Sequence, residues 1–240
     1  MIGPVINSAA IICGAIIGGF LGPVVGKGFQ DRFMLVFGCI SIGLGGYMIS
    51  GAAAIPPIVV AIMGGALLGE ATRIEAGVNW LAHGTANVFS RLVCKQSAVQ
   101  ADALREQFVV FTVVFSVSGL SFFGAMREGL TGDSSMLLVK ALLDFPTALF
   151  VAAGTGAIIG TLFLPQLLVQ IVVLLVAGVV AHWTTPMMQA DFTGCGGFIT
   201  LATGFRMCNL VRFPILGMLP SLLLVMPLSS LWHDFVAGVL

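Results

Sequence analysis

The sequence predicts an all-α fold: a polytopic integral membrane protein with about eight transmembrane helices in a single domain, residues 1–240. Only 8% of the residues are charged, whereas about 25% are charged in average soluble proteins. Hydrophobic residues make up 58% of the chain, and the mean hydropathy is +1.11. Several apolar runs approach the roughly 20 residues that a helix needs to cross a bilayer. The lipid bilayer is therefore the first partner that we expect.

The candidate spans follow one another with few polar interruptions. The N-terminal run is apolar from its start and lacks the basic region of a signal peptide, so we expect a retained first span. Pro56 and Pro57 suit the first turn of the third span, where proline is well tolerated. In order, the spans are 4–25, 33–50, 56–72, 108–126, a helix within 136–164, 165–181, 192–208 and 213–232.

Residues 73–93 differ from these spans, because their apolar side chains recur at helical spacings of three and four along one face. The pattern predicts an amphipathic helix in the membrane interface, with Trp80 and Phe89 as anchors. The polar segment 95–107 that follows it is expected to face water.

Basic residues favour eight spans with both termini outside the cytoplasm. In that layout nearly all basic loop residues lie on the inside, as the positive-inside rule requires; only Arg127 lies outside, and the side of Lys140 is left open. The alternative, seven spans plus a re-entrant segment at 192–208, moves Arg206 and Arg212 outside and weakens this bias.

A weak internal repeat appears when the sequence is shifted by 158 positions. The shift places Gly38 on Gly196 and Gly46 on Gly204, and it also matches Tyr47 with Phe205 and Pro56 with Pro214. It predicts inverted halves at 4–72 and 165–232, with the interfacial helix and loop at 73–107 and connecting spans at 108–164. Inverted repeats are a recurrent architecture of secondary transporters.

Glycines recur every four residues on three predicted spans. Such faces let helix backbones approach closely in lipid, and they also suit a homo-oligomer interface. The glycines that we expect to pack helices together are Gly14, Gly18, Gly22, Gly65, Gly69, Gly156 and Gly160.

Lys140 and Asp144 are the main candidates for a functional site. At i and i+4 they share a helix face and can pair, and an ion pair inside a membrane suggests function. However, a complete span can be counted from Phe145 onward, which favours Asp144 as a helix N-cap before Pro146. Both interpretations place the pair where it could contact a solute or a gate.

Other polar residues could complete a pathway through the bilayer. Glu70 and Arg73 are i, i+3 neighbours at the inner end of the third span, where they could pair and form a gate. Asn7, Gln166 and Asn209 could contact a solute, although each could equally cap a helix or bond a neighbouring helix.

Charge and motifs disfavour other classes of protein. Ten basic and ten acidic residues give zero net charge, so no affinity for nucleic acid is expected. Signatures of common hydrolases, zinc proteases and nucleotide-binding proteins are absent, so we expect neither an enzyme nor a cofactor. The five cysteines and three histidines lack metal-ligand spacing, and the cysteines are expected to pack as small apolar residues.

Four segments together resemble a bacterial inner-membrane family catalogued as domain of unknown function family 554. They are "INSAAIICGAIIGGFLG", "GGALLGEATRIEAGVNWL", "GAMREGLTGDSSMLLVKALLDF" and "GGFITLATGFRMCNLVRFPILGMLPSLLLVMPL", and they fall between residues 6 and 228. Arg127 stands where the family usually has glutamine. The resemblance implies a multi-pass plasma-membrane protein, often described as a transport protein, and supplies no catalytic residues.

Three functions remain open at this point. The favoured one is a small-solute or ion transporter of the bacterial inner membrane that works by alternating access between inverted repeats. The alternatives are an oligomeric channel or pore and a membrane scaffold that transports nothing. The sequence does not name the solute.

Overall fold

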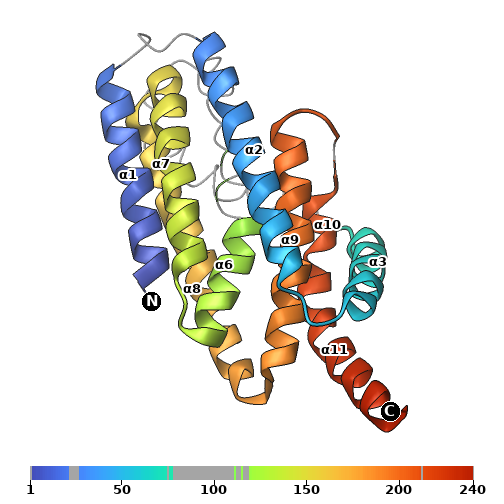
Figure 1. Cartoon of the computed structure of the whole chain (residues 1–240). Coiled ribbons are helices and arrows are strands. Elements are labelled where there is room, and N and C mark those ends of the chain that lie inside the picture. Colours follow the sequence, from blue (N-terminus) through green and yellow to red (C-terminus); the bar gives the residue numbers. More distant parts are fainter. Residues whose placement is uncertain are drawn as a thin grey trace.

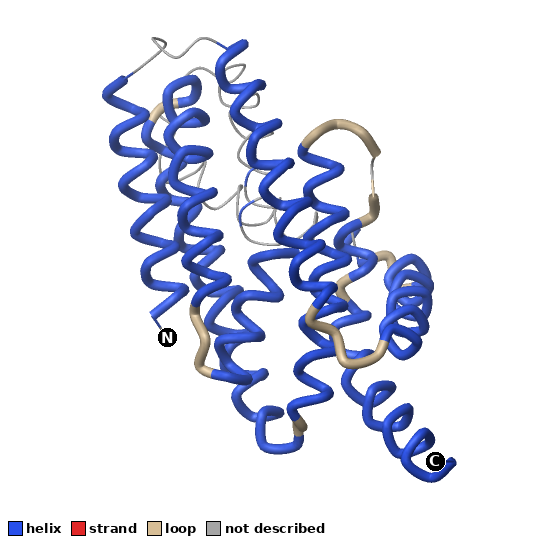
Figure 2. Tube along the Cα trace, in the orientation of Figure 1, coloured by secondary structure: helices blue, strands red, loops and turns tan. Residues whose placement is uncertain are grey.

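The computed structural model describes residues 2–21, 27–74, 76–77, 111, 115, 119–211 and 213–239, and all regular structure among them is helical (Figure 2). The all-α prediction is therefore confirmed for this part of the chain. The α-helices are α1 (Ile2–Leu21), α2 (Lys27–Ser50), α3 (Ile55–Ala71), α6 (Gly119–Thr131), α7 (Ser135–Thr155), α8 (Phe163–Val180), α9 (Pro186–Met207), α10 (Ile215–Met218) and α11 (Pro220–Val239). Short 3-10 helices, η2 (Ala157–Leu162) and η3 (Ala181–Trp183), flank α8.

The helices form two groups that lie side by side (Figure 1). One group consists of α1, α6, α7 and α8, and the other of α2, α3, α9 and α11. The beginning of α1 and the end of α11 both lie toward the lower end of the bundle in Figure 1.

Four helical segments are long and apolar enough to cross a membrane: Ile2–Leu21, Ser135–Gly154, Ala157–Trp183 and Ile215–Val236. They correspond to the first, fifth, sixth and eighth predicted spans. Shorter apolar helices, Leu35–Ser50 and Ile55–Ala71, correspond to the second and third. Large hydrophobic side chains such as Phe20, Leu67 and Leu142 remain exposed on these helices, as expected where lipid is the solvent. The chain is a multi-pass membrane protein.

Two predicted segments fall largely outside the described residues. The interfacial helix 73–93 is described only at its beginning, and nothing in the structure bears on the loop 95–107. The fourth predicted span, 108–126, is represented mainly by α6, which continues to Thr131.

Glycines set the spacing between α1 and α7, which run parallel. A Cβ atom on Gly14 would overlap the carbonyl oxygen of Phe145, and one on Gly18 would overlap that of Leu149. The backbones of these two helices consequently touch, as small residues permit in membrane proteins.

Glycines also bring α3 against α10 and the start of α11. A Cβ on Gly65 would overlap the backbone of Ser221, and one on Gly69 would overlap the carbonyl oxygen of Gly217. These two positions of α3 lie one helical turn apart, so one edge of the helix is in backbone contact with the C-terminal part of the chain.

Gly156 has a different role from the packing role expected for it. A Cβ there would meet nothing within 4 Å, whereas its φ of +89° lies in the region that favours glycine. Gly156 ends α7 and lets the chain turn into η2. Gly160, in η2, lies against α1, where its added Cβ would stand 3.1 Å from that of Ala15. Gly22 lies outside the described residues.

Candidate functional site

Lys140 and Asp144 lie within one continuous helix. α7 extends from Ser135 to Thr155 with Ser134 at its N-cap and Pro146 in its interior. The expectation that Asp144 begins a span is therefore wrong, because the helix starts more than two turns earlier. The alternative interpretation, an ion pair within a span, agrees with the structure: Lys140 Nζ and Asp144 Oδ2 form a salt bridge inside the candidate span Ser135–Gly154.

Both charged side chains are buried, and a third polar group joins them. Lys140 is 2% exposed and Asp144 is 9% exposed. Gln166 of α8 donates a hydrogen bond from Nε2 to Asp144 Oδ2 at 3.2 Å. The carboxylate therefore has an ammonium and an amide as partners, which reduces the cost of placing a charge in the bundle.

A second amide lies one turn further along α8. Gln170 Nε2 donates a 3.0 Å hydrogen bond to Ser121 Oγ of α6, and both residues are fully buried. Gln166 and Gln170 face the same side of α8, because residues four apart lie on one helix face. The α8 amides therefore link to both α6 and α7.

Asn7 of α1 is fully buried, and neither Oδ1 nor Nδ2 has a hydrogen-bond partner. Gly3 of α1 contacts Leu137 of α7, and Gly14 contacts Phe145. Because Asn7 lies between these two glycines, it faces the part of α7 between Leu137 and Phe145. That interval contains both Lys140 and Asp144.

The contacts of α1 with η2 give the level of Asn7 relative to α8. Gly160 lies beside Ala15, and Gly19 lies beside Ala157. The two segments therefore run antiparallel. Asn7 lies about two turns before Ala15, so it faces the part of α8 about two turns after Gly160, which carries Gln166 and Gln170. We call Asn7, Ser121, Lys140, Asp144, Gln166 and Gln170 the central polar cluster.

The central polar cluster has unused hydrogen-bonding capacity. Three amide oxygens, Asn7 Oδ1, Gln166 Oε1 and Gln170 Oε1, lack partners, as does Asn7 Nδ2. Most buried polar atoms in proteins are hydrogen-bonded, and each one left unsatisfied costs about 1–3 kcal/mol. Unpartnered amide atoms on Gln166, which bonds the ion pair, and on Gln170 and Asn7 are suited to receive a polar ligand.

Buried apolar residues flank the cluster on both sides along α7 and α8. Toward one end, Ala148 of α7 and Leu162 before α8 belong to one buried hydrophobic cluster. Toward the other end, Met136 of α7 and Ala177 of α8 belong to a second. Along both helices the polar residues therefore lie between two apolar layers.

Glu70, Arg73 and Asn209 do not belong to the central polar cluster. All three are exposed, and Arg73 and Asn209 have positive φ angles of 51° and 55° beyond the ends of α3 and α9. Glu70 and Arg73 are joined through their backbones, Arg73 N to Glu70 O at 3.1 Å. The ion pairs of the described residues do not include the expected pairing of their side chains.

Sequence reasoning missed a buried carboxylate, Asp191, near the start of α9. Asp191 is fully buried. Its Oδ1 accepts a 2.7 Å hydrogen bond from Ala54 N, and its Oδ2 accepts one of 2.6 Å from Ser229 Oγ. The same Oδ2 lies 3.3 Å from His233 Nε2. No local sequence pattern could have joined His233 to Asp191, because 42 residues separate the two. This carboxylate joins α9, α11 and the connection between α2 and α3.

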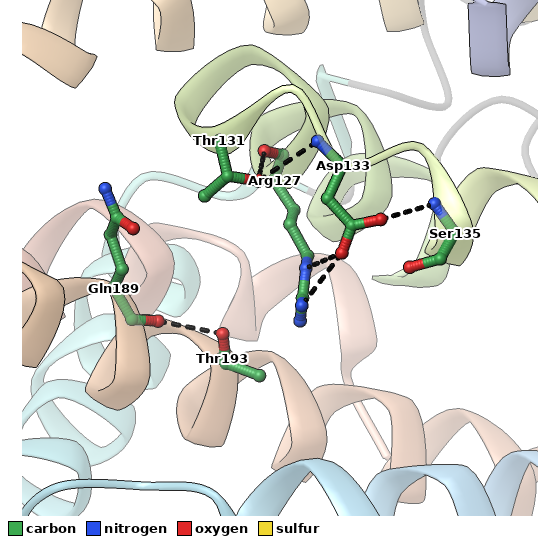
Figure 3. Close-up of polar contacts among 6 residues, drawn as sticks. All are labelled: Arg127, Thr131, Asp133, Ser135, Gln189 and Thr193. Atoms are coloured by element: carbon green, nitrogen blue, oxygen red, sulfur yellow. Dashed lines mark hydrogen bonds and ion pairs between the residues drawn. The ribbon is translucent and has the colours of Figure 1, made fainter.

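Arg127 lies near the end of α6, across from Gln189 and Thr193 of α9 (Figure 3). It lines a pocket of about 240 Å³. It forms a 3.0 Å ion pair with Asp133 in the following loop. Hydrogen bonds from Ser135 and the Arg127 guanidinium lower the pKa of Asp133 below its usual 3.8. Because this carboxylate remains charged at neutral pH, it compensates Arg127 and holds the α6–α7 turn together.

Glu128, the neighbour of Arg127, turns inward and caps α1. Its Oε1 accepts a 2.8 Å hydrogen bond from Ile2 N, and both carboxylate oxygens are within hydrogen-bonding distance of Gly3 N. A carboxylate at a helix N-terminus satisfies free backbone N–H groups and interacts favourably with the helix dipole. No group of three or more histidine, cysteine or acidic residues suited to a metal occurs among the described residues.

A multi-pass bundle of apolar helices around a buried polar cluster defines a polytopic membrane protein. Residues 2–230 match the family model described as "Protein of unknown function (DUF554)". The chain belongs to this family.

Bacterial relatives cover nearly the whole chain. The "Uncharacterized protein YqgA" of Escherichia coli (strain K12) is 37% identical over 99% of this chain and 100% of its own length. The "Uncharacterized membrane protein YdfK" of Bacillus subtilis (strain 168) is 28% identical over 98% of both chains. No solved structure matches the chain.

Proposed function

We propose that the protein is a carrier that moves a small solute across the bacterial inner membrane by alternating access, with the central polar cluster as its binding site. The observation that carries this proposal is the set of unpartnered amide atoms on Asn7, Gln166 and Gln170. A purely structural cluster would be more stable if these atoms were paired or replaced by apolar groups. A solute that bonds to them would explain why they remain free.

The packing of α2 on α9 supports an inverted repeat. Gly38 lies beside Gly204, where an added Cβ would be 2.9 Å from the carbonyl oxygen, and Gly45 lies beside Gly197 at 2.7 Å. An offset of 159 places Gly38 on Gly197 and Gly45 on Gly204. The same offset therefore converts the Gly38–Gly204 contact into the Gly45–Gly197 contact, as a two-fold repeat requires. The helices run antiparallel, as a two-fold axis in the membrane plane requires.

The same offset relates the buried faces of α1 and α8. The buried residues of α8, Gln166, Gln170, Leu174 and Ala177, fall 159 positions after four buried residues of α1, Asn7, Ile11, Ala15 and Gly18. Asn7 therefore corresponds to Gln166. The packing favours an offset of 159 over the offset of 158 suggested by the sequence. Both offsets pair the same elements, α1–α3 with α8–α11. Equivalent amides from both halves would then meet near the midplane.

The length of α9 supports its assignment as a span rather than a re-entrant segment. It is one uninterrupted helix of 22 residues, or about 33 Å, enough to cross the roughly 30 Å hydrocarbon core. With α9 and α6 included, eight spans would place both termini on the same side. We assign that side to the outside on the distribution of basic residues.

Burial favours a carrier over an open channel. No residue of the central polar cluster is more than 9% exposed, and buried apolar residues flank it in both directions along α7 and α8. A solute would reach the cluster only when one layer opens, which is the defining feature of alternating access. A pore would instead require a continuous polar path.

A ligand screen by thermal unfolding tests this proposal. The purified protein is heated with each member of a library of small polar metabolites. A ligand that binds the folded state adds about 2.7 kcal/mol of stability at 100 times Kd and thereby raises the midpoint temperature of unfolding. We expect at least one compound to stabilise the wild type but not Gln166→Leu or Asn7→Leu. Gln189→Leu, at the pocket near Arg127, is the control and should keep the shift. Stabilisation that survives both cluster substitutions would contradict the proposed site.

A further inference from the structure

We infer that the solute is a small uncharged molecule rich in hydrogen-bond donors, of the class of ureas, simple amides and polyols. This class depends on the proposed function, because it describes the ligand of the same cluster. Two independent features of the cluster lead to it: its charge balance and the kind of polar atoms that it leaves without partners.

The charges of the central polar cluster already balance. Lys140 and Asp144 neutralise each other directly, and Gln166 provides a further bond to the carboxylate. The other charges near the ends of α6 and α7 are engaged elsewhere: Glu128 at the N-terminus of α1 and Arg127 with Asp133. A bound ion would therefore add a net charge to a buried site, which is strongly unfavourable without a partner. An uncharged solute leaves the balance intact.

A zwitterion would also preserve the charge balance, but at a different cost. Its ammonium and carboxylate would have to separate Lys140 from Asp144 in order to pair with them. Breaking a buried pair is costly, since each partner must be compensated by the ligand with comparable geometry. An uncharged molecule can bind to the free amide atoms without disturbing the salt bridge.

The unpartnered atoms determine which uncharged molecules fit. Three are acceptors, the side-chain carbonyl oxygens of Asn7, Gln166 and Gln170, and one is a donor, Asn7 Nδ2. The Gln166 amide is oriented by the carboxylate of Asp144, which can accept only from Nε2. A complementary ligand must donate more hydrogen bonds than it accepts at these positions. Ureas, amides and polyols all carry several N–H or O–H groups on a small frame.

Uptake into proteoliposomes tests this solute class. Vesicles with the full-length protein receive radiolabelled urea, acetamide, glycerol or mannitol, and parallel samples receive glycine, sodium or chloride. We expect at least one neutral compound to enter faster than into protein-free vesicles. Gln166→Leu and Asn7→Leu should each lower this uptake about tenfold, since one lost hydrogen bond weakens binding by roughly that factor. Gln189→Leu should not lower it.

The outcomes distinguish this inference from the proposal beneath it. Uptake of glycine, sodium or chloride that requires Gln166, without uptake of any neutral compound, would overturn the solute class and leave the carrier proposal standing. Uptake of a neutral compound that both cluster substitutions leave unchanged would overturn the assignment to this site. If no compound enters and the thermal screen also finds no ligand that depends on Gln166, both the solute class and the carrier proposal are wrong.

Discussion

Replacement of Lys140 by methionine is expected to destabilise the folded protein by about 3–5 kcal/mol, because it leaves Asp144 as an uncompensated buried charge. Lys140 is 2% exposed and is the cation that contacts this carboxylate. The measurement is the free energy of unfolding of the purified protein in detergent, compared with wild type. Asp144→Leu should be destabilising for the same reason, since it leaves the Lys140 ammonium without its partner.

The double variant Lys140→Met, Asp144→Leu separates structure from function. Replacing both members of a buried pair with apolar residues of similar volume is often neutral or stabilising, so we expect stability to return to near the wild-type value. Solute binding should remain impaired, because Gln166 loses the carboxylate that orients its amide. If Lys140→Met alone is as stable as wild type, the pair is not buried as described.

Gly45→Ala is expected to destabilise the protein whereas Gly46→Ala is not, although they alter neighbouring residues of one helix. A Cβ on Gly45 would lie 2.7 Å from Gly197 O and 2.7 Å from Leu201 N, whereas a Cβ on Gly46 would meet nothing within 4 Å. Overpacking at Gly45 should cost about 1–3 kcal/mol. At Gly46, alanine should be neutral or stabilising by up to about 1 kcal/mol, because it favours the helix.

Unfolding of the two single variants in the same detergent checks this prediction, and Gly197→Ala provides a second test of the contact. A Cβ on Gly197 would lie 2.8 Å from Gly45 O, so this change should resemble Gly45→Ala. Equal effects of Gly45→Ala and Gly46→Ala would contradict the α2–α9 packing, and with it the offset of 159 that supports the proposed inverted repeat.

Local patterns in the sequence predicted the helical class, most span positions and the pairing of Lys140 with Asp144. Helix periodicity and apolar length are local properties, and the i, i+4 spacing alone places the two charges on one face. The error at Asp144 arose from counting a full span after it. In the structure, Gly156 ends α7 with a positive φ, and the chain continues as the short helix η2. Glycine as a helix terminator was visible in the sequence and could have shifted the span toward Ser135.

The assembly of the site could not be predicted in the same way. Ser121 bonds Gln170 across 49 positions, and Asp191 contacts His233 across 42. No local pattern joins such residues, because their proximity depends on which helices pack together. The offset of the proposed repeat is of the same kind. Matches among common glycines do not fix an offset, and the value of 159 proposed above depends on the Gly38–Gly204 and Gly45–Gly197 contacts between distant helices.

Access to the central polar cluster from the two sides of the membrane tests the central claim most directly. The five native cysteines are first replaced by alanine. Ser121→Cys then introduces a single thiol at a fully buried position of the cluster and changes only the side-chain oxygen to sulfur. Ala148→Cys, equally buried but in an apolar layer, is the matched control. The measurement is labelling by a membrane-impermeant maleimide in right-side-out and in inside-out vesicles. A carrier predicts labelling of Ser121→Cys in both preparations and little labelling of Ala148→Cys; labelling of Ser121→Cys in neither preparation, or in only one, would contradict alternating access.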